Sequence, residues 1–247
     1  MKKVGLEFSM VLMLAIVSFT YPSMAPADSL PSHSALKKAL QSVVGGKNGG
    51  FELNMWATIV DRDGMVEAVV FSGNDRGDQW PGSRVISAQK ANTANAFSLP
   101  DLALSTANLF TAVQPGGSLY GLQHSNPVDT SVAYGGSSEK IGTKQDPMVG
   151  KKIGGVNVFG GGLPLYDKKG KLVGAIGVSG DSSCADHNIA WKVRHALKLD
   201  YVPKGVSPTN DDNIVYGDTP WAHPVCSPEA QKVAEALVTT HPISKKK

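Results

Sequence analysis

Hydrophobic residues recur along the chain with two different spacings, which distinguish helices from strands. Over residues 34–44 they recur every three or four positions and the run ends at two glycines, which predicts a short amphipathic helix. Over residues 55–60 and 65–71, β-branched and aromatic residues are frequent, and residues 61–64 between the two runs end in a glycine. These features predict two antiparallel strands joined by a tight turn.

Helical spacing returns in the middle of the chain. Residues 81–97 place a valine and several alanines on one side, which predicts a helix that packs closely on a sheet. A second helix is predicted over residues 100–113, because Pro100 suits a first helical turn. Residues 114–155 are rich in glycine, serine, asparagine, aspartate and proline and show little periodicity. We therefore expect an excursion over the surface there.

The last part of the chain predicts a second hairpin and two more helices. The hairpin strands fall at residues 160–166 and 171–179, and a serine-capped helix follows to about residue 199. Residues 203–228 are irregular, and 229–238 predict a short helix. This order predicts an α+β fold, a single domain with one mainly antiparallel sheet flanked by helices. Alternating strand–helix–strand units are absent, which argues against a doubly wound nucleotide-binding fold.

The N-terminus predicts export. Lys2 and Lys3 precede an apolar run over residues 10–19, and residues 25–27 read Ala-Pro-Ala, so we expect a signal peptide over 1–27 that is cleaved after Ala27. An uncleaved anchor is the alternative, although the run is shorter than the roughly 20 residues of a membrane span. Cleavage removes two lysines and one glutamate, which lowers the formal charge from +3 to +2. That charge is too small to indicate nucleic acid or a membrane surface as a partner.

The two cysteines, Cys184 and Cys226, would meet an oxidising compartment after export, either periplasmic or extracellular. A disulfide between them would stabilise the protein by about 4 kcal/mol in the chain-entropy model. Two unpaired thiols are the alternative, because sequence spacing does not show whether the two sulfurs approach each other.

Three stretches together resemble the GlcG/HbpS-like haem-binding (haem-degrading domain) family, which is related to the C-terminal haem-binding module of PduO-type proteins. They are Ala-Thr-Ile-Val-Asp-Arg-Asp-Gly at 57–64, Ser-Ala-Gln-Lys-Ala-Asn-Thr-Ala at 87–94, and Gly-Gly-Leu-Pro-Leu at 161–165 followed by Leu-Val-Gly-Ala-Ile-Gly-Val-Ser-Gly at 172–180. The last is the most specific.

The resemblance implies a profilin-like or PAS-like domain over residues 28–199, non-covalent haem as the cofactor, and assembly into homo-oligomers. Two departures from the family pattern are the insertion at about 114–155 and a C-terminal extension at 200–247. Either addition would remodel a ligand site or an interface. The family does not carry its iron ligands in one shared motif, so no iron ligand is transferred by position.

The glycine-rich start of the second hairpin is one candidate ligand site. Gly161 and Gly162, followed by Pro164, allow a close approach of the backbone to a ligand or to a neighbouring helix. Lys90, on the resembled helix, would be a reactive amine if it were buried, and otherwise a solvated lysine.

The helix over 183–199 presents two unlike faces. Its aliphatic face packs on the sheet, while His187, Trp191, Arg194 and His195 fall on the other side. Such a face suits a subunit interface, through Trp191, Arg194 and His195, or the edge of a haem whose iron His187 binds. We expect the interface.

His124 lies in the excursion with Tyr120 and Tyr134 nearby in sequence, and both residue types are known iron ligands. The alternative is a solvated loop histidine, and His223 is a weaker candidate. The residues 184–187 lack the second cysteine of a covalent haem attachment motif, so any haem would be held non-covalently.

The sequence therefore predicts an exported haem-binding protein for haem sensing, storage or handling. The alternative is an exported enzyme or accessory factor that acts on a small organic acid or another metabolite. A nucleophile elbow, a phosphate-binding loop and a zincin motif are all absent from the sequence, so no catalytic residue is assigned.

Overall fold

A computed structural model describes residue 1 and residues 30–245 of the chain. The predicted signal peptide and its cleavage point lie outside the described residues, Met1 apart. Within the part that is described, no helix is both long and apolar enough to cross a membrane.

A four-stranded sheet forms the centre of the domain. Its strands are β1 (Trp56–Asp61), β2 (Val66–Phe71), β3 (Gly162–Tyr166) and β4 (Leu172–Ser179), in the order β2-β1-β4-β3. Every neighbouring pair is antiparallel. Both predicted hairpins and the α+β class are confirmed.

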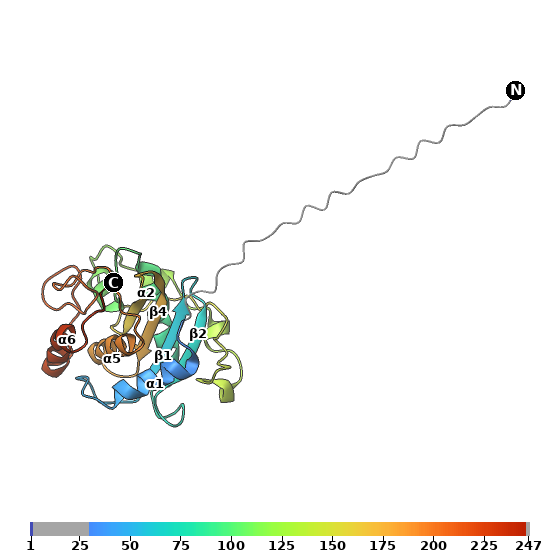
Figure 1. The fold of residues 1–247 in the computed structure, drawn as a ribbon, viewed down its shortest axis with the longest axis horizontal. Coiled ribbons are helices and arrows are strands. Elements are labelled where there is room, and N and C mark those ends of the chain that lie inside the picture. The colour runs from blue at the N-terminus through green and yellow to red at the C-terminus, as the bar shows by residue number, and fades with distance from the viewer. Residues whose placement is uncertain (2–29, 246–247) are drawn as a thin grey trace.

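Helices cover both faces of the sheet (Figure 1). The helices α1 (His33–Val44) and α5 (Ser183–Ala196) cover one face, where Ile59 and Ile176 are fully buried. The helix α2 (Ser83–Phe97) covers the other face. Successive strand residues point to opposite faces, so β1, β2 and β4 each contribute to both cores.

The contact between α2 and β4 explains the most specific of the resembled motifs. A Cβ atom added at Gly177 would lie 1.9 Å from the carbonyl oxygen of Ser87 and 2.6 Å from the nitrogen of Ala91. Only glycine at this position lets the helix backbone rest directly on the strand. The alanines of α2 serve the same close packing, with Ala88 and Ala91 fully buried.

The predicted helix over 100–113 is wrong. Two short 3-10 helices stand there, η1 (Thr106–Leu109) and η2 (Thr111–Val113). The side chain of Asn108 accepts a hydrogen bond from the backbone N–H of Ser105 at 3.0 Å. Polar side chains that bond to nearby backbone groups compete in this way with a regular α-helix.

The predicted surface excursion over 114–155 is partly buried. It contains α3 (Leu122–Ser125), α4 (Thr130–Ala133) and η3 (Ser138–Lys140). Its last part packs on the core beside α2, where Met148 is fully buried. Asp146 forms a buried ion pair with Arg84 of α2, which fixes the excursion to the domain.

The C-terminal extension folds back over α5 instead of leaving the domain. It ends in α6 (Pro228–Thr240), which lies against α5 (Figure 1). A disulfide joins Cys184 at the start of α5 to Cys226, so the predicted pairing is confirmed.

Candidate functional site

The prediction that the second face of α5 points outward is wrong. His187 and Arg194 have no exposed surface, and Trp191 is 1% exposed. The C-terminal extension covers them: the indole N–H of Trp191 donates to the carbonyl oxygen of His241 at 2.8 Å. The chain's own extension therefore covers the face at which a subunit contact was expected.

Arg194 binds the extension through its charge. Its guanidinium donates to both carboxylate oxygens of Asp212, at 2.6 and 2.8 Å, and to the carbonyl oxygen of Pro164 at 3.0 Å. The same guanidinium lies 4.9 Å from the centre of the Trp191 ring. His195 is half-buried and pairs with Asp200 at 2.7 Å. These side chains therefore join α5 to its own extension.

His187 is enclosed by the same extension. Its Nε2 atom accepts the backbone N–H of Ile214 at 3.0 Å, and burial lowers the pKa of the ring to about 3. The imidazole is therefore neutral at physiological pH. No part of it is exposed, which leaves a haem iron no approach.

The glycine-rich strand contacts helices. A Cβ atom added at Gly162 would lie 2.5 Å from the carbonyl oxygen of Lys90, and one at Gly160 would lie 2.4 Å from that of Ser183. At Gly160 and Gly162 a helix backbone is therefore a close neighbour, whereas a Cβ atom at Gly161 would lie 2.4 Å from the carbonyl oxygen of Val178 in β4.

Lys90 is buried as an ion pair in the same region. Its ammonium donates to Asp186 at 2.6 Å and to the carbonyl oxygen of Val178 at 3.1 Å. A Cβ atom at Gly161 would lie 3.2 Å from this ammonium. Lys90, Gly161, Gly162, Pro164 and His187 therefore form the packed centre of the domain.

The remaining predicted ligand residues are exposed, and they do not share one hollow. Tyr120 is 65% exposed and lies two residues before the start of α3, which carries the exposed His124. Tyr134, at the end of α4, lines a hollow of about 380 Å³ together with Trp56 and Arg84. Neither His124 nor Tyr120 lines that hollow.

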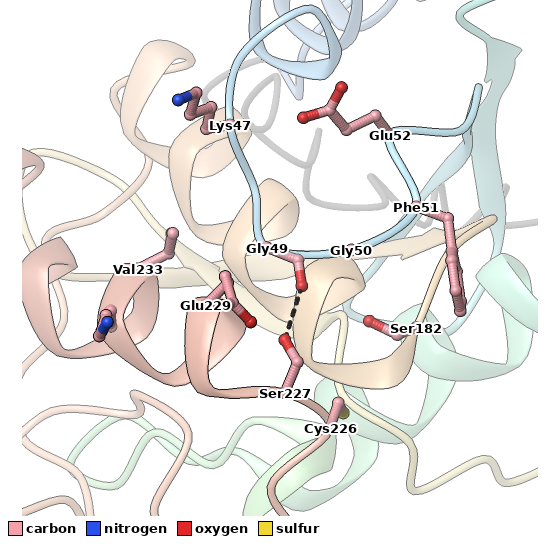
Figure 2. Close-up of a pocket in the computed structure, with 11 residues that line it drawn as sticks. Lys47, Gly49, Gly50, Phe51, Glu52, Ser182, Cys226, Ser227, Glu229 and Val233 are labelled. Carbon is pink, nitrogen blue, oxygen red and sulfur yellow. Dashed lines mark hydrogen bonds between the residues drawn. The ribbon is translucent and has the colours of Figure 1, made fainter.

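A larger hollow lies where the extension meets the domain, and no sequence motif predicts it. It has a volume of about 630 Å³. Three segments distant in sequence form it: the loop over 47–52, the start of α5 and the start of α6 (Figure 2). Its described lining is Lys47, Gly49, Gly50, Phe51, Glu52, Ser182, Cys226, Ser227, Glu229, Lys232 and Val233.

The walls of this hollow are held in place by hydrogen bonds. The backbone N–H of Phe51 donates to both oxygens of Asp181 at 2.9 Å, which holds the loop against α5. The hydroxyl of Ser227 donates to the carbonyl oxygen of Gly49 at 3.1 Å, which holds the loop against α6 (Figure 2). The hollow is thus preformed in the folded chain.

The chemistry of the hollow is apolar with charged groups around it. Phe51, which is 72% exposed, and Val233 supply apolar surface. Two lysines and two glutamates supply charges of both signs. Among the described residues that line it, none is a histidine, a tyrosine or a methionine. The lining offers no strong iron ligand while Cys226 is in the disulfide.

The family model of the haem degrading protein HbpS-like family matches residues 34–194, which is more than half of the chain. The chain belongs to this family. The match contains the loop over 47–52 and the start of α5, but it ends before α6. One wall of the hollow therefore belongs to the HbpS-like domain, and the other belongs to this chain's own extension.

Several solved structures are similar to the chain. Protein ORFY of Klebsiella pneumoniae is 24% identical with a TM-score of 0.44, over 70% of this chain and 96% of that one. A PduOC:heme complex is 26% identical with a TM-score of 0.44, over 66% of this chain and 89% of that one. A double mutant of HbpS from Streptomyces reticuli is 18% identical with a TM-score of 0.40, over 71% and 99% of the two chains. No curated protein matches the chain.

Proposed function

We propose that this protein binds haem, or a similar flat tetrapyrrole, non-covalently in the hollow between the domain and its extension. Membership of a family described by haem degradation is the observation that carries the proposal. We further propose that the protein works outside the cytoplasm, periplasmic or secreted, which the disulfide and the predicted signal peptide support. Assembly into homo-oligomers stays an expectation from the resemblance.

The hollow fits the ligand by size and by chemistry. Its volume of about 630 Å³ falls in the range of small-molecule sites. The exposed ring of Phe51 offers a flat apolar surface on which a macrocycle can stack. Lys47 and Lys232 are cations that can pair with the two propionates of haem.

The residues that line the hollow predict how much the iron contributes to the affinity for haem. Because the described lining supplies no histidine, tyrosine or methionine, affinity in this hollow rests on the macrocycle and its carboxylates. We expect iron-free protoporphyrin to bind within about threefold of haem, a difference well under 1.4 kcal/mol. Fluorescence titration with protoporphyrin and absorbance titration with hemin measure the two dissociation constants. Strong preference for hemin would instead indicate coordination, with His124 or Tyr120 as the exposed candidates.

Phe51→Ala should weaken binding of either ligand about tenfold, because a stacked aromatic contributes on the order of 1 kcal/mol and the hollow also loses apolar area. Phe159→Ala is the matched control, since Phe159 is also exposed but does not line the hollow. His124→Ala separates the two sites. If His124→Ala abolishes hemin binding while Phe51→Ala leaves it unchanged, the hollow is not the haem site.

The same hollow supports a second candidate function, the binding of a small organic acid. The two lysines and the N-termini of α5 and α6 supply positive charge for a carboxylate. A thermal-shift screen tests it, because a ligand that binds only the folded state raises the apparent stability. Stabilisation by a carboxylic acid but not by hemin would favour this function over haem binding.

A further inference from the structure

Three metal-ligating side chains meet at the junction between α5 and the extension. The ligand atoms of Cys184, His223 and Cys226 all lie within 4.8 Å of one another. The Sγ atom of Cys184 lies 3.9 Å from Nδ1 of His223. In the disulfide form the two sulfurs are bonded to each other and are not ligands.

The surroundings favour the thiolate form that both sulfurs adopt when they bind a metal. Cys184 is the second residue of α5, which has 14 residues, and the N-terminus of a helix stabilises negative charge. The backbone N–H of Cys184 already donates to Sγ of Cys226 at 3.1 Å. Cys226 is exposed and lies in irregular chain before α6, so its sulfur can move away from that of Cys184.

Both ring nitrogens of His223 have hydrogen-bond partners at this junction. Its Nδ1 faces the sulfurs and lies 2.7 Å from the carbonyl oxygen of Pro224. Its Nε2 lies 2.7 Å from the hydroxyl oxygen of Ser183, which also accepts the backbone N–H of Gly160 at 2.8 Å. If the ring proton moves to Nε2, it is donated to Ser183, and the lone pair of Nδ1 becomes available to a metal once the carbonyl oxygen of Pro224 moves away. A fixed partner on the second ring nitrogen is typical of histidine ligands.

We propose that the reduced protein binds one thiophilic metal ion, represented by Zn²⁺, through Cys184, Cys226 and His223. An external dithiol gives two electrons and two protons to the disulfide, which yields two cysteine thiols and the oxidised dithiol. Zn²⁺ then displaces both thiol protons as the two Zn–S bonds form. Three protein ligands leave one coordination position open for water or another donor. Cys226 lines the hollow, so the ion can enter from there.

The distances require only a small rearrangement. Zn–S bonds of about 2.3 Å in a tetrahedron place two sulfurs about 3.8 Å apart. The sulfur–nitrogen distance of 3.9 Å is already close to that spacing. The two sulfurs have to separate, and the carbonyl oxygen of Pro224 has to leave Nδ1 of His223. Both movements fall in the exposed segment 224–226. This site does not depend on haem binding.

Cobalt serves as the spectroscopic probe. Titration of the reduced chain with Co²⁺ under anaerobic conditions should give sulfur-to-cobalt charge-transfer bands and tetrahedral visible bands that saturate at one ion per chain. Zn²⁺ should abolish these bands by displacing Co²⁺, and either ion added to the metal-free reduced chain should release two protons per ion. The oxidised chain should give none. Octahedral spectra, or equal binding by reduced and oxidised chains, would overturn the proposal.

Variants assign the ligands. Cys226→Ser should abolish the charge-transfer bands, and His223→Asn should weaken binding at least tenfold while keeping the disulfide of the oxidised form. Ser183→Ala should weaken binding about tenfold, as removal of a ligand's hydrogen-bond partner does. His124→Asn is the matched control and should bind as the wild type. Wild-type affinity in His223→Asn would contradict the site.

Circular dichroism of the reduced chain before and after metal addition controls for folding. If reduction loosens the extension, recovery of the signal with Co²⁺ supports the site, because the metal then binds the folded arrangement. Loss of structure that Co²⁺ does not reverse would overturn it.

Discussion

Replacing Trp191 by alanine is expected to lower the free energy of unfolding by about 3–5 kcal/mol, the usual cost of truncating a buried tryptophan. The indole is 1% exposed and packs in the core shared by α5 and Leu237 of α6. Its N–H bond to His241 is lost as well. For a domain of this size the loss corresponds to a fall of roughly 10 °C in melting temperature.

Urea or thermal unfolding followed by circular dichroism measures the effect. Trp80→Ala is the matched control, because Trp80 is 53% exposed and should change stability by less than about 0.5 kcal/mol. A Trp191→Ala protein as stable as Trp80→Ala, with its oligomer dissociated in light scattering, would instead return the indole to a subunit contact.

The sheet and the inner face of α5 could be predicted because their signals are local. A strand is indicated by a few residues that alternate between apolar and polar or are all apolar, and a turn such as 61–64 is indicated by its glycine. Ile189 and Val193 recur at helical spacing and do pack in the core against the sheet. Such patterns need no knowledge of the rest of the chain.

The outer face of α5 could not be predicted in the same way. Its polar and aromatic side chains are covered by residues that follow in irregular chain, among them Asp212 and Asn213, and irregular segments have no periodicity to show where they pack. A buried arginine needs its partner, and the sequence does not say which of many aspartates provides it. The same limit applies to Gly162: a glycine indicates that another group comes close to the backbone, but the sequence does not show which segment supplies that group.

The hollow was missed for a related reason. Its walls come from residue 47 at one end and residue 233 at the other, and no motif joins them. An aromatic side chain in a glycine-rich loop, Phe51, is the one local sign, and it resembles any exposed aromatic. The cysteine pair was more informative, because two cysteines allow only one intramolecular disulfide if they pair at all.

Lys90→Met is expected to cost about 3–5 kcal/mol at neutral pH, because it leaves the carboxylate of Asp186 buried without its cation. Both side chains are almost fully buried, at 1% and 3% exposed. Burial lowers the pKa of Lys90 and raises the pKa of Asp186 to about 6, even though each charge favours the other. The attraction between the two charges therefore offsets the free-energy cost of burying them. When Lys90 is removed, the cost of burying the Asp186 carboxylate is no longer offset.

The sign of the pH dependence follows from Asp186. An acid whose pKa is higher in the folded state than in the unfolded state binds more protons when folded, so between about pH 4 and pH 6 its contribution to stability falls as the pH rises. Removal of Lys90 removes an effect that lowers this pKa, so the variant's carboxyl stays protonated to higher pH. Lys90→Met should therefore be less destabilised at pH 5 than at pH 8.

A double-mutant cycle separates the charge from the packing. The double variant Lys90→Met with Asp186→Asn should lose clearly less unfolding free energy than the sum of the losses in the two single variants. In the wild type the backbone N–H of Asp181 donates to Asp186 at 2.9 Å, and the amide oxygen of Asn can accept the same bond without a buried charge. Lys144→Met, at an exposed lysine, is the matched control and should change stability by less than about 0.5 kcal/mol. Urea unfolding of each variant at pH 5 and pH 8 supplies the values. If the losses of unfolding free energy are additive and do not vary with pH, Lys90 stabilises the core through its methylene groups alone. The ion pair would then make no measurable contribution to the packing of α2 against α5.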